Sequence, residues 1–473
     1  MLFNSLTFII FFIITYTLYL LLYRKTGWQN ALILIASYIF YGYWDWRFLT
    51  LIIISTLVDF LIGLRLGRTE DEHARKRLLA ISLIVNLSIL GFFKYFNFFS
   101  DNFTDILNLV GMEADPITLN IILPVGISFY TLQTISYTFD IYRRKMQPTK
   151  NLLEFAVFVA FFPQLMAGPI ERAINLLPQI AHPRQITSSQ VHIGLYLILM
   201  GYFKKVVVAD NVATIANQVF NHYTWYTDLD IFLAVMAFLF QLYGDFSGYS
   251  DIARGLAKLM GFELMVNFKL PFFALTPADY WERWHISLSS WMRDYLFIPL
   301  GGSRGSKWMT IRNLFIIMVI GGLWHGAGLN FIVWGIYDGF ILGIYLFFRD
   351  MTFPLNIPTR KFKFIILPLQ MFAMFSTNFF RSLLFRVTST DQFDRMLRTV
   401  SFIPTEHSSD FISTLLFFIT PLILMEIYQY FKHDLLAIMK LPIILRNLIY
   451  AFMIYWIFLY GVQESVEFFY FQF

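Results

Sequence analysis

The chain has 473 residues, of which 58% are hydrophobic and only 14% are charged. Soluble domains carry about 25% charged residues, so this chain lacks the polar surface that a water-soluble fold needs. With a net charge of +5 and no cysteine, it also offers no basic patch for nucleic acid, no disulfide, no thiolate metal site and no cysteine nucleophile. The composition predicts an all-α polytopic membrane protein.

Apolar stretches of about 20 residues, the length of a membrane-spanning helix, recur along the chain. The first begins near the N-terminus without a cleavage-site pattern, so we expect a permanent span there rather than a signal peptide. We treat residues 1–473 as one integral-membrane domain with about 10–12 transmembrane helices. The clearest spans are expected at 6–23, 30–44, 48–64, 78–99, 118–139, 190–209, 231–244, 363–385, 410–431 and 443–461.

Loop charges predict the orientation. Residues 65–77 and 143–150 are rich in arginine and lysine, whereas residues 101–116 contain four acids and no basic residue. Because cytoplasmic loops of membrane proteins carry the excess of basic residues, the first two loops are expected inside and the third outside.

Two apolar stretches do not have the pattern of a single span. Residues 152–170 are interrupted by proline and glycine between 163 and 169, which predicts a re-entrant segment. Residues 312–348 are too long for one crossing and too short for two, and we expect two helices that meet at a glycine-rich bend around His325. Irregular backbone at membrane depth must be buried in protein or line a cavity, so these breaks predict a central cavity.

Polar residues inside apolar segments are costly, and they are densest between Gln241 and Asp294. The stretch 281–295 alternates tryptophan with charged residues, which is typical of an amphipathic segment at the interface or along a cavity rim. Asp245 and Asp251 lie on different faces of a helix, so they are not expected to form an acid/base pair with each other. We expect them to pair with arginine at 254, 283 or 293.

His325 can have a structural role or a functional one. An imidazole in a tight helix bend can serve structure alone by bonding a neighbouring carbonyl, whereas ionisable groups at membrane depth usually have a function. For His285, among tryptophans, a structural hydrogen bond is an equal alternative. The sequence contains no nucleophile elbow, phosphate-binding loop, zinc-protease motif or dinucleotide fingerprint. The residues alone therefore indicate a membrane enzyme or a transporter with His325 at its centre.

Two longer stretches resemble a known family. WERWHISLSSWMRDYLFIPLGGSRG at 281–305 and GGLWHGAGLNFIVWG at 321–335 are similar to the signature stretches of the membrane-bound O-acyltransferase family, in its bacterial alginate O-acetyltransferase branch. Further similar stretches lie at 32–49, 126–145, 161–173 and 243–262, together with a C-terminal FFYFQF.

The resemblance implies acetyl transfer from cytoplasmic acetyl-CoA to an acceptor outside the bacterial inner membrane, with His325 as the catalytic histidine and His285 as a second motif histidine. Acetyl-CoA is then a donor substrate, and neither a bound cofactor nor a metal is expected. The branch works in the lipid bilayer with an extracytoplasmic partner of the SGNH esterase fold. Residues expected to hold the nucleotide end of the donor are Trp281, Arg283, Trp284 and Arg293.

Two positions depart from the family pattern. Glu282 stands where a basic residue is usual, and Asp338 replaces a histidine common in the branch. The acceptor is left open among alginate, peptidoglycan, cellulose and other exopolysaccharides. D-alanyl transfer to teichoic acid and a non-catalytic conduit or transporter remain alternative functions.

Overall fold

The computed structural model describes residues 1–113, 115–119, 121–166, 168–349 and 359–462, without the side chains of 359–365. Within these ranges the regular structure is helical, apart from one isolated bridge between Asp228 and Val400. The predicted all-α class is confirmed. The C-terminal FFYFQF, at 468–473, lies outside the described residues.

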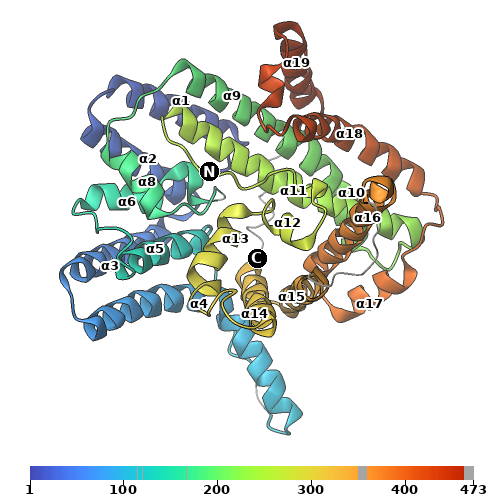
Figure 1. Ribbon diagram of the computed structural model, residues 1–473, viewed down its shortest axis with the longest axis horizontal. Helices are drawn as coiled ribbons and strands as arrows, with labels where there is room; N and C mark the ends of the chain where they lie inside the picture. Colours follow the sequence, from blue (N-terminus) through green and yellow to red (C-terminus); the bar gives the residue numbers. More distant parts are fainter. Residues whose placement is uncertain (114, 120, 167, 350–358, 463–473) are drawn as a thin grey trace. The chain divides into compact units, whose positions relative to one another are not determined.

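The chain divides into two units. Unit 1 contains Met1–Ile198 and Ile252–Met265, and unit 2 contains Leu199–Asp251 and Val266–Phe473. The helices that begin in unit 1 (Figure 1) are α1 (Leu6–Leu21), α2 (Thr26–Asp45), η1 (Trp46–Phe48), α3 (Leu49–Arg68), α4 (Glu72–Leu109), α5 (Ile127–Tyr142), α6 (Leu152–Ala160), α7 (Phe162–Leu165), α8 (Ala173–Ala181) and α9 (Ser188–Tyr202).

The helices that begin in unit 2 (Figure 1) are η2 (Phe203–Ala209), α10 (Asp210–Asn221), α11 (Asp228–Leu259), η3 (Pro271–Phe273), α12 (Pro277–Trp281), α13 (Ile286–Met292), η4 (Arg293–Phe297), α14 (Lys307–His325), α15 (Leu329–Arg349), α16 (Thr359–Arg386), α17 (Thr390–Thr399), α18 (Ser408–Lys432), η5 (Ala437–Lys440) and α19 (Ile443–Tyr460). Two of them, η2 and η4, are π-helices.

A buried polar cluster joins α3 and α4 in unit 1. The carboxylate of Asp59 accepts hydrogen bonds from Ser82 at 2.6 Å and from Asn86 at 2.8 Å, and the Asn86 amide oxygen accepts one from Ser55 at 2.6 Å. All four side chains are buried. Interhelical hydrogen bonds of this kind contribute about 1 kcal/mol each where water cannot compete.

Arg75 is buried, although the sequence places it in a basic loop. Its guanidinium donates to the carbonyls of Leu66 and Thr69 at the end of α3, and to those of Ile141 and Tyr142 at the end of α5. Helix ends leave carbonyls without intrahelical partners, and one arginine satisfies them here. Arg75 therefore joins two helix ends.

Residues 152–166 form the two short helices α6 and α7 with a break at Phe161. At the break, the carbonyl of Phe158 accepts from the side-chain amides of Gln133 at 2.6 Å and Gln164 at 2.9 Å. The segment from 155 to 165 is buried. The expectation of an interrupted segment enclosed by protein is thereby confirmed, because side chains satisfy the backbone that the break exposes.

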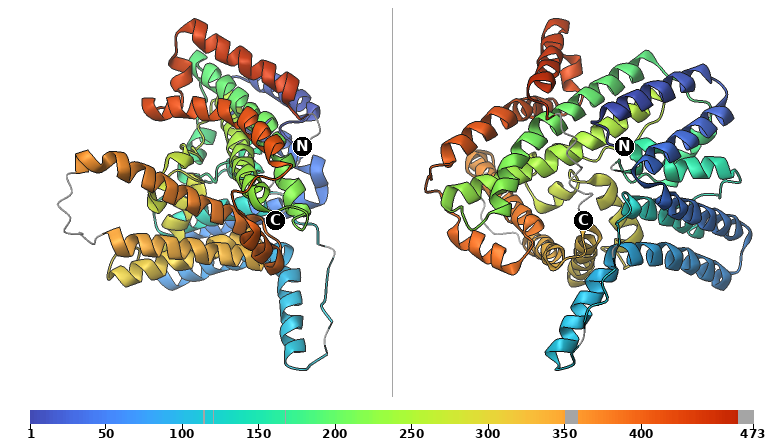
Figure 2. Two further views of the ribbon diagram at one scale, coloured as in Figure 1. Left: turned by 90° about the vertical axis from the view of Figure 1, so that its right-hand side faces the viewer. Right: turned by 180° about the vertical axis from the view of Figure 1, so that it is seen from behind.

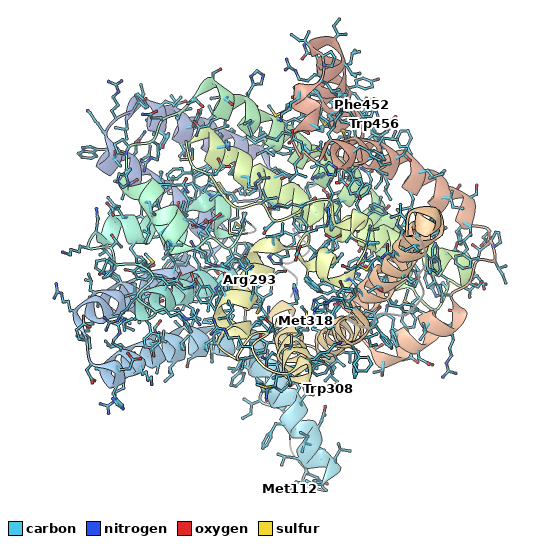
Figure 3. All side chains as sticks on the ribbon, viewed as in Figure 1. Met112, Arg293, Trp308, Met318, Phe452 and Trp456 are labelled. Carbon is cyan, nitrogen blue, oxygen red and sulfur yellow. The ribbon has the colours of Figure 1, made fainter. Side chains whose placement is uncertain are left out.

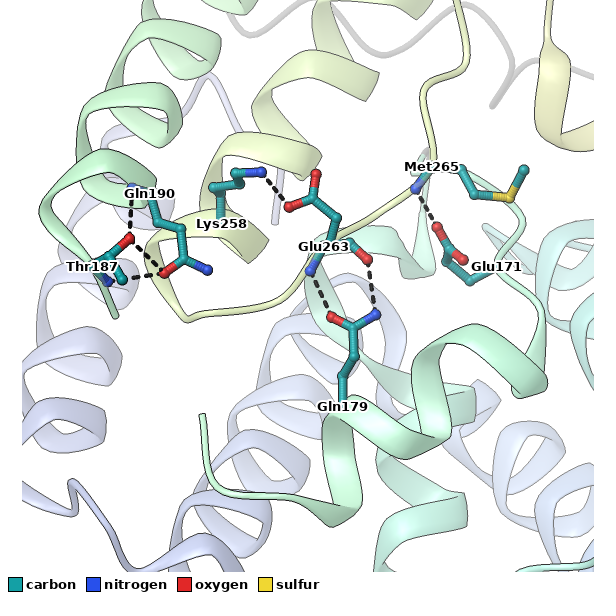
Figure 4. A network of polar contacts seen from close by, with 7 residues as sticks. All are labelled: Glu171, Gln179, Thr187, Gln190, Lys258, Glu263 and Met265. Atoms are coloured by element: carbon teal, nitrogen blue, oxygen red, sulfur yellow. Dashed lines mark hydrogen bonds and ion pairs between the residues drawn. The ribbon is translucent and has the colours of Figure 1, made fainter. Parts of the chain in front are cut away.

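The chain beyond this segment is tied to residues 252–265 of the same unit (Figure 4). Gln179 and Glu263 exchange two hydrogen bonds, from the Glu263 N–H at 2.7 Å and to the Glu263 carbonyl at 3.1 Å. The Glu263 carboxylate pairs with Lys258, and the carboxylate of Glu171 accepts from the Met265 N–H. Burial raises the pKa of Glu171 to about 7.

In unit 2, α14 and α15 lie side by side along their lengths (Figure 2). Glycines allow this approach, since a Cβ atom at Gly322 would lie 2.1 Å from the carbonyl oxygen of Phe331, and one at Gly335 would lie 2.5 Å from that of Met318. Larger residues at these two positions would push the helices apart. Elsewhere in the unit, α18 meets α19 through Trp456, labelled in Figure 3, whose ring stacks on Phe417 at 4.7 Å.

Two acids of α11, Asp245 and Asp251, pair with lysines of the π-helix η2. Lys205 lies 2.8 Å from both Asp210 and Asp245, and Lys204 lies 2.9 Å from Asp251. The sequence predicts arginine partners for Asp245 and Asp251, and these lysine partners are not among its predictions. The π-helical turn lets two consecutive lysines pair with acids of the same neighbouring helix. The spacing of residues in the sequence does not reveal this arrangement.

Eight helical segments in the described ranges are long and apolar enough to cross a membrane, which makes this a multi-pass membrane protein. They are Thr26–Arg68, Glu72–Leu109, Ser188–Asn221, Asp228–Leu259, Lys307–His325, Leu329–Arg349, Ser408–Lys432 and Ile443–Tyr460. The span expected at 118–139 is wrong in extent, because its helix, α5, begins only at Ile127 and is buried along nearly its whole length. Apolar residues that pack against protein have the same composition as residues that face lipid.

The orientation predicted from loop charges can be tested by labelling, because the chain has no native cysteine. Single cysteines at the exposed positions Lys76 and Lys145 are expected to react with an impermeant maleimide only from the cytoplasmic side, and one at exposed Glu113 only from outside. Arg75 is unsuitable as a reporter because its side chain is buried. Labelling of position 113 from the cytoplasm would reverse the assigned topology.

Candidate active site

His325 is the last residue of α14, where the chain leaves the helix through an extended Gly326 and re-enters helix at Leu329. The two helices predicted to meet at a glycine-rich bend are thus present. A Cβ atom at Gly326 would lie 2.0 Å from the ring of Phe331, so only glycine fits in this conformation. The bend fixes His325 at the junction of two closely packed helices.

Aromatic rings surround the imidazole of His325, which is 5% exposed. Its ring centroid lies 5.0 Å from that of Trp324, 5.1 Å from Trp334 and 5.3 Å from Phe385, all in edge-to-face geometry. Edge-to-face packing on three rings restricts rotation of the imidazole. The histidine is therefore held in place by the shape of its surroundings.

A cavity of about 460 Å³ reaches His325. Its lining is mostly apolar and includes Trp281, Glu282, Arg293, Met318, His325 and Trp334. The side chain of Arg293 is 63% exposed, whereas His325 is buried, so the cavity connects an exposed arginine with an enclosed imidazole. Its volume lies in the range of small-molecule binding sites, about 300–1,000 Å³.

His285 is the N-cap of α13 and has a left-handed conformation, with φ of 42° and ψ of 53°. Its ring packs edge-on against Phe246 at 4.6 Å and lies 5.9 Å from Trp324. Trp324 therefore contacts both His285 and His325. Burial lowers the pKa of His285 to about 3, which keeps this imidazole neutral at physiological pH.

The four residues predicted to hold the donor divide into two groups. Trp281 and Arg293 line the cavity (Arg293 is labelled in Figure 3), and Arg293 also pairs with Asp294 at 2.9 Å. Trp284 is buried with its ring stacked on Tyr280, outside the cavity lining. The roles of all four stay predictions.

Arg283 also lies outside the cavity lining. It pairs with Asp279 at 2.6 Å and donates to the carbonyl of Lys269. Glu282, the first departure from the family pattern, lines the cavity beside Trp281.

One feature of the site was missed by sequence reasoning, the buried ion pair between Asp338 on α15 and Arg381 on α16. The guanidinium of Arg381 lies over the rings of Tyr280 and Trp281. Asp338 drew attention only as a departure from the family pattern. The sequence signal that could have revealed the pair is an arginine inside the apolar stretch 363–385, because such a charge needs a buried partner.

Comparison with known proteins shows to which family the chain belongs. A family model described as MBOAT, membrane-bound O-acyltransferase family, matches residues 143–385, more than half of the chain. The chain belongs to this family. All six predicted site residues lie within the matched range, and membership classes the chain with the acyltransferases.

Three relatives illustrate the similarity. The probable alginate O-acetylase AlgI of Pseudomonas aeruginosa is 44% identical over 347 residues, which cover 73% of this chain and 66% of the relative. The protein of the same name from Azotobacter vinelandii is 42% identical over 370 residues, 78% of this chain and 73% of the relative. A peptidoglycan O-acetyltransferase of Helicobacter pylori is 37% identical over 358 residues, 70% of this chain and 66% of the relative.

The neutral state of His285 predicts a pH dependence of stability. The unfolded chain binds a proton at His285 below its ordinary pKa of 6.5, whereas the folded protein does not until about pH 3. The stability contributed by the neutral imidazole is therefore fully present above pH 6.5. It is lost progressively as the pH falls from 6.5 toward about 3.

We expect the free energy of unfolding of the wild type, relative to His285→Gln, to fall by up to about 1.4 kcal/mol per pH unit between pH 6 and pH 4. Unfolding curves of detergent-solubilised protein at pH 7.5, 6, 5 and 4 measure it. His182→Gln, which removes an exposed imidazole at the end of α8, is the control. Parallel curves for wild type and His285→Gln would contradict the assignment of a buried neutral imidazole.

Proposed function

We propose that the protein transfers an acetyl group from cytoplasmic acetyl-CoA to a hydroxyl on an extracytoplasmic polysaccharide, with His325 as the general base. The observation that carries the proposal is the position of His325, which combines enclosure by three aromatic rings with access to a cavity whose lining also includes the exposed Arg293. A histidine used only to cap a helix bend needs no such cavity.

The chemistry requires one base and one leaving group. The acceptor hydroxyl has a pKa far above 7, and neutral imidazole is the side chain suited to remove its proton near neutral pH. As the proton moves to His325, the hydroxyl oxygen attacks the thioester carbonyl and an ester bond forms. The carbon–sulfur bond breaks, and the CoA thiolate takes the proton from His325 at its sulfur as it leaves, which returns His325 to the neutral form. Acetyl-CoA and the hydroxyl compound thus become an acetyl ester and free CoA.

The walls of the cavity suit the donor. Trp281 and Trp334 offer flat apolar surface beside His325 for the acyl and pantetheine portions, and Arg293 at the exposed end can pair with a phosphate. His285 contacts Trp324 and, being neutral, can orient a group by hydrogen bonding without adding charge. We assign His285 a positioning role and keep the base role for His325.

The acceptor and the partner belong to the same proposal. Relatives named for acetylation of alginate and of peptidoglycan favour an extracytoplasmic carbohydrate polymer. Transfer across the membrane needs a second opening of the cavity and an acceptor protein outside, for which an SGNH-type esterase-fold partner is suited. The protein would then operate in a bacterial inner membrane, where acetyl-CoA is available on the cytoplasmic face.

Replacing the base tests the proposal against the alternative of a non-catalytic conduit. We expect His325→Gln and His325→Ala to reduce acetyl-CoA turnover by purified protein by about 10²- to 10⁴-fold, the usual contribution of general base catalysis. Expression and thermal midpoint are expected to remain near wild type. His192→Gln, at an exposed position on α9, is the matched control. Wild-type turnover by both His325 variants would end the proposal.

Replacing Arg293, the exposed arginine of the cavity lining, tests where the donor binds. Arg293→Gln removes one charge that can pair with a phosphate, and the KM for acetyl-CoA is expected to rise about tenfold with little change in kcat. Arg398→Gln is a suitable control, because Arg398 is also exposed and paired with a nearby aspartate, Asp394, on α17. An unchanged KM in Arg293→Gln would place the donor phosphates elsewhere.

A further inference from the structure

The ion pair between Asp338 and Arg381 is the most enclosed charged contact near the cavity. The Arg381 Nε lies 3.0 Å from each carboxylate oxygen of Asp338, and a second guanidinium nitrogen also donates to Asp338. A further guanidinium N–H donates to the side-chain oxygen of Asn378, one turn away on α16. The side chain of Asp338 is 0% exposed and that of Arg381 is 7% exposed.

The guanidinium also supports two rings of α12. Its central carbon lies 4.1 Å from the ring centroid of Tyr280 and 5.5 Å from that of Trp281. Trp281 in turn meets Trp334 edge-on at 6.0 Å, and Trp334 meets His325 at 5.1 Å. A continuous series of contacts therefore runs from the ion pair through the cavity wall to the proposed base.

Neither Asp338 nor Arg381 lines the cavity, whereas Trp281 and Trp334 do. Any contact with a ligand in the cavity would be made by the tryptophans, and the ion pair acts behind them. Joining α15 to α16 alone does not require a charge, because apolar residues of similar size usually pack as stably as a buried ion pair. A planar guanidinium is required if one group must bind a carboxylate in two places and also stack on aromatic rings.

We propose that Asp338 and Arg381 are positioning residues that fix the orientation of Trp281 and so shape the wall of the His325 cavity. The assignment also accounts for Asp338, which departs from the family pattern, since here its carboxylate holds the arginine in register with Tyr280 and Trp281. The part of the inference that concerns the acetyl donor rests on the proposed function.

The test separates charge pairing from ring support. Arg381→Lys keeps a cation for Asp338 but loses the planar stack, and the exchange Asp338→Arg with Arg381→Asp keeps the pair while moving the guanidinium to α15. Both are measured as full-length protein in lipid nanodiscs. We expect thermal midpoints close to wild type, with the KM for acetyl-CoA raised about tenfold and a smaller fall in kcat. If the exchanged variant had both the KM for acetyl-CoA and the thermal midpoint of the wild type, the proposal would be overturned.

A second readout does not depend on catalysis. In this cysteine-free chain, Met318→Cys places a thiol in the cavity lining, and Trp308→Cys places one at an exposed position on the same helix (both positions are labelled in Figure 3). Arg381→Lys is expected to change the alkylation rate at position 318 by a small maleimide about fivefold or more, with no change at position 308. Arg386→Lys, which removes a guanidinium that lies over the rings of Phe220 and Phe238 outside the cavity lining, controls for loss of a guanidinium–ring stack as such.

The two readouts distinguish the two proposals. Absence of acetyl-CoA turnover in the wild type would refute the proposed function, while a changed alkylation rate at position 318 would still support the positioning role. Normal turnover with neither KM nor alkylation altered in Arg381→Lys and in the exchanged pair would refute the positioning role alone.

Discussion

Backbone polar groups in a membrane protein must be satisfied by the protein itself, and the interruptions in this chain depend on that requirement. Where α6 gives way to α7, the amides of Gln133 and Gln164 bond the carbonyl of Phe158. Where α3 and α5 end, Arg75 bonds their last carbonyls. Because side chains supply these bonds, the chain can afford breaks in its helices. The break after α14 places His325 at the end of its helix, since a helix that continued through Gly326 would carry His325 on its side.

Buried charges are likewise satisfied by partners within the protein. Lys205 is held between Asp210 and Asp245, and Asp338 is held by Arg381. Removing one partner of such a pair leaves a charge without compensation, which typically costs about 3–5 kcal/mol. These pairs therefore constrain the helices that carry them to one arrangement. The guanidinium of Arg381 also lies over the ring of Trp281, which lines the cavity, whereas Lys205 and its two acids lie outside the cavity lining.

The candidate site is mostly apolar, and aromatic rings surround its histidine. Three rings orient His325, and Trp324 separates it from the neutral His285. Apolar surroundings of this kind strengthen the hydrogen bonds of a neutral imidazole and exclude competing water. In the proposed function, the exposed Arg293 of the same cavity lining supplies the charge that an anionic donor needs. The proposal thus assigns polar recognition and proton transfer to different residues of one cavity.

The sequence by itself determined the membrane class, most of the long helices and the bend at His325, because apolar length, proline and glycine act locally along the chain. It also indicated the family through the two stretches that contain His285 and His325. Tertiary structure alone decided that α5 is buried, that Arg75 joins two helix ends, and that Asp245 and Asp251 pair with lysines. It also decided that Trp281 lines the cavity while its neighbour Trp284 packs into the core, and that Asp338 meets Arg381. These outcomes depend on which helix lies opposite each side chain, and no periodicity within a single segment contains that information.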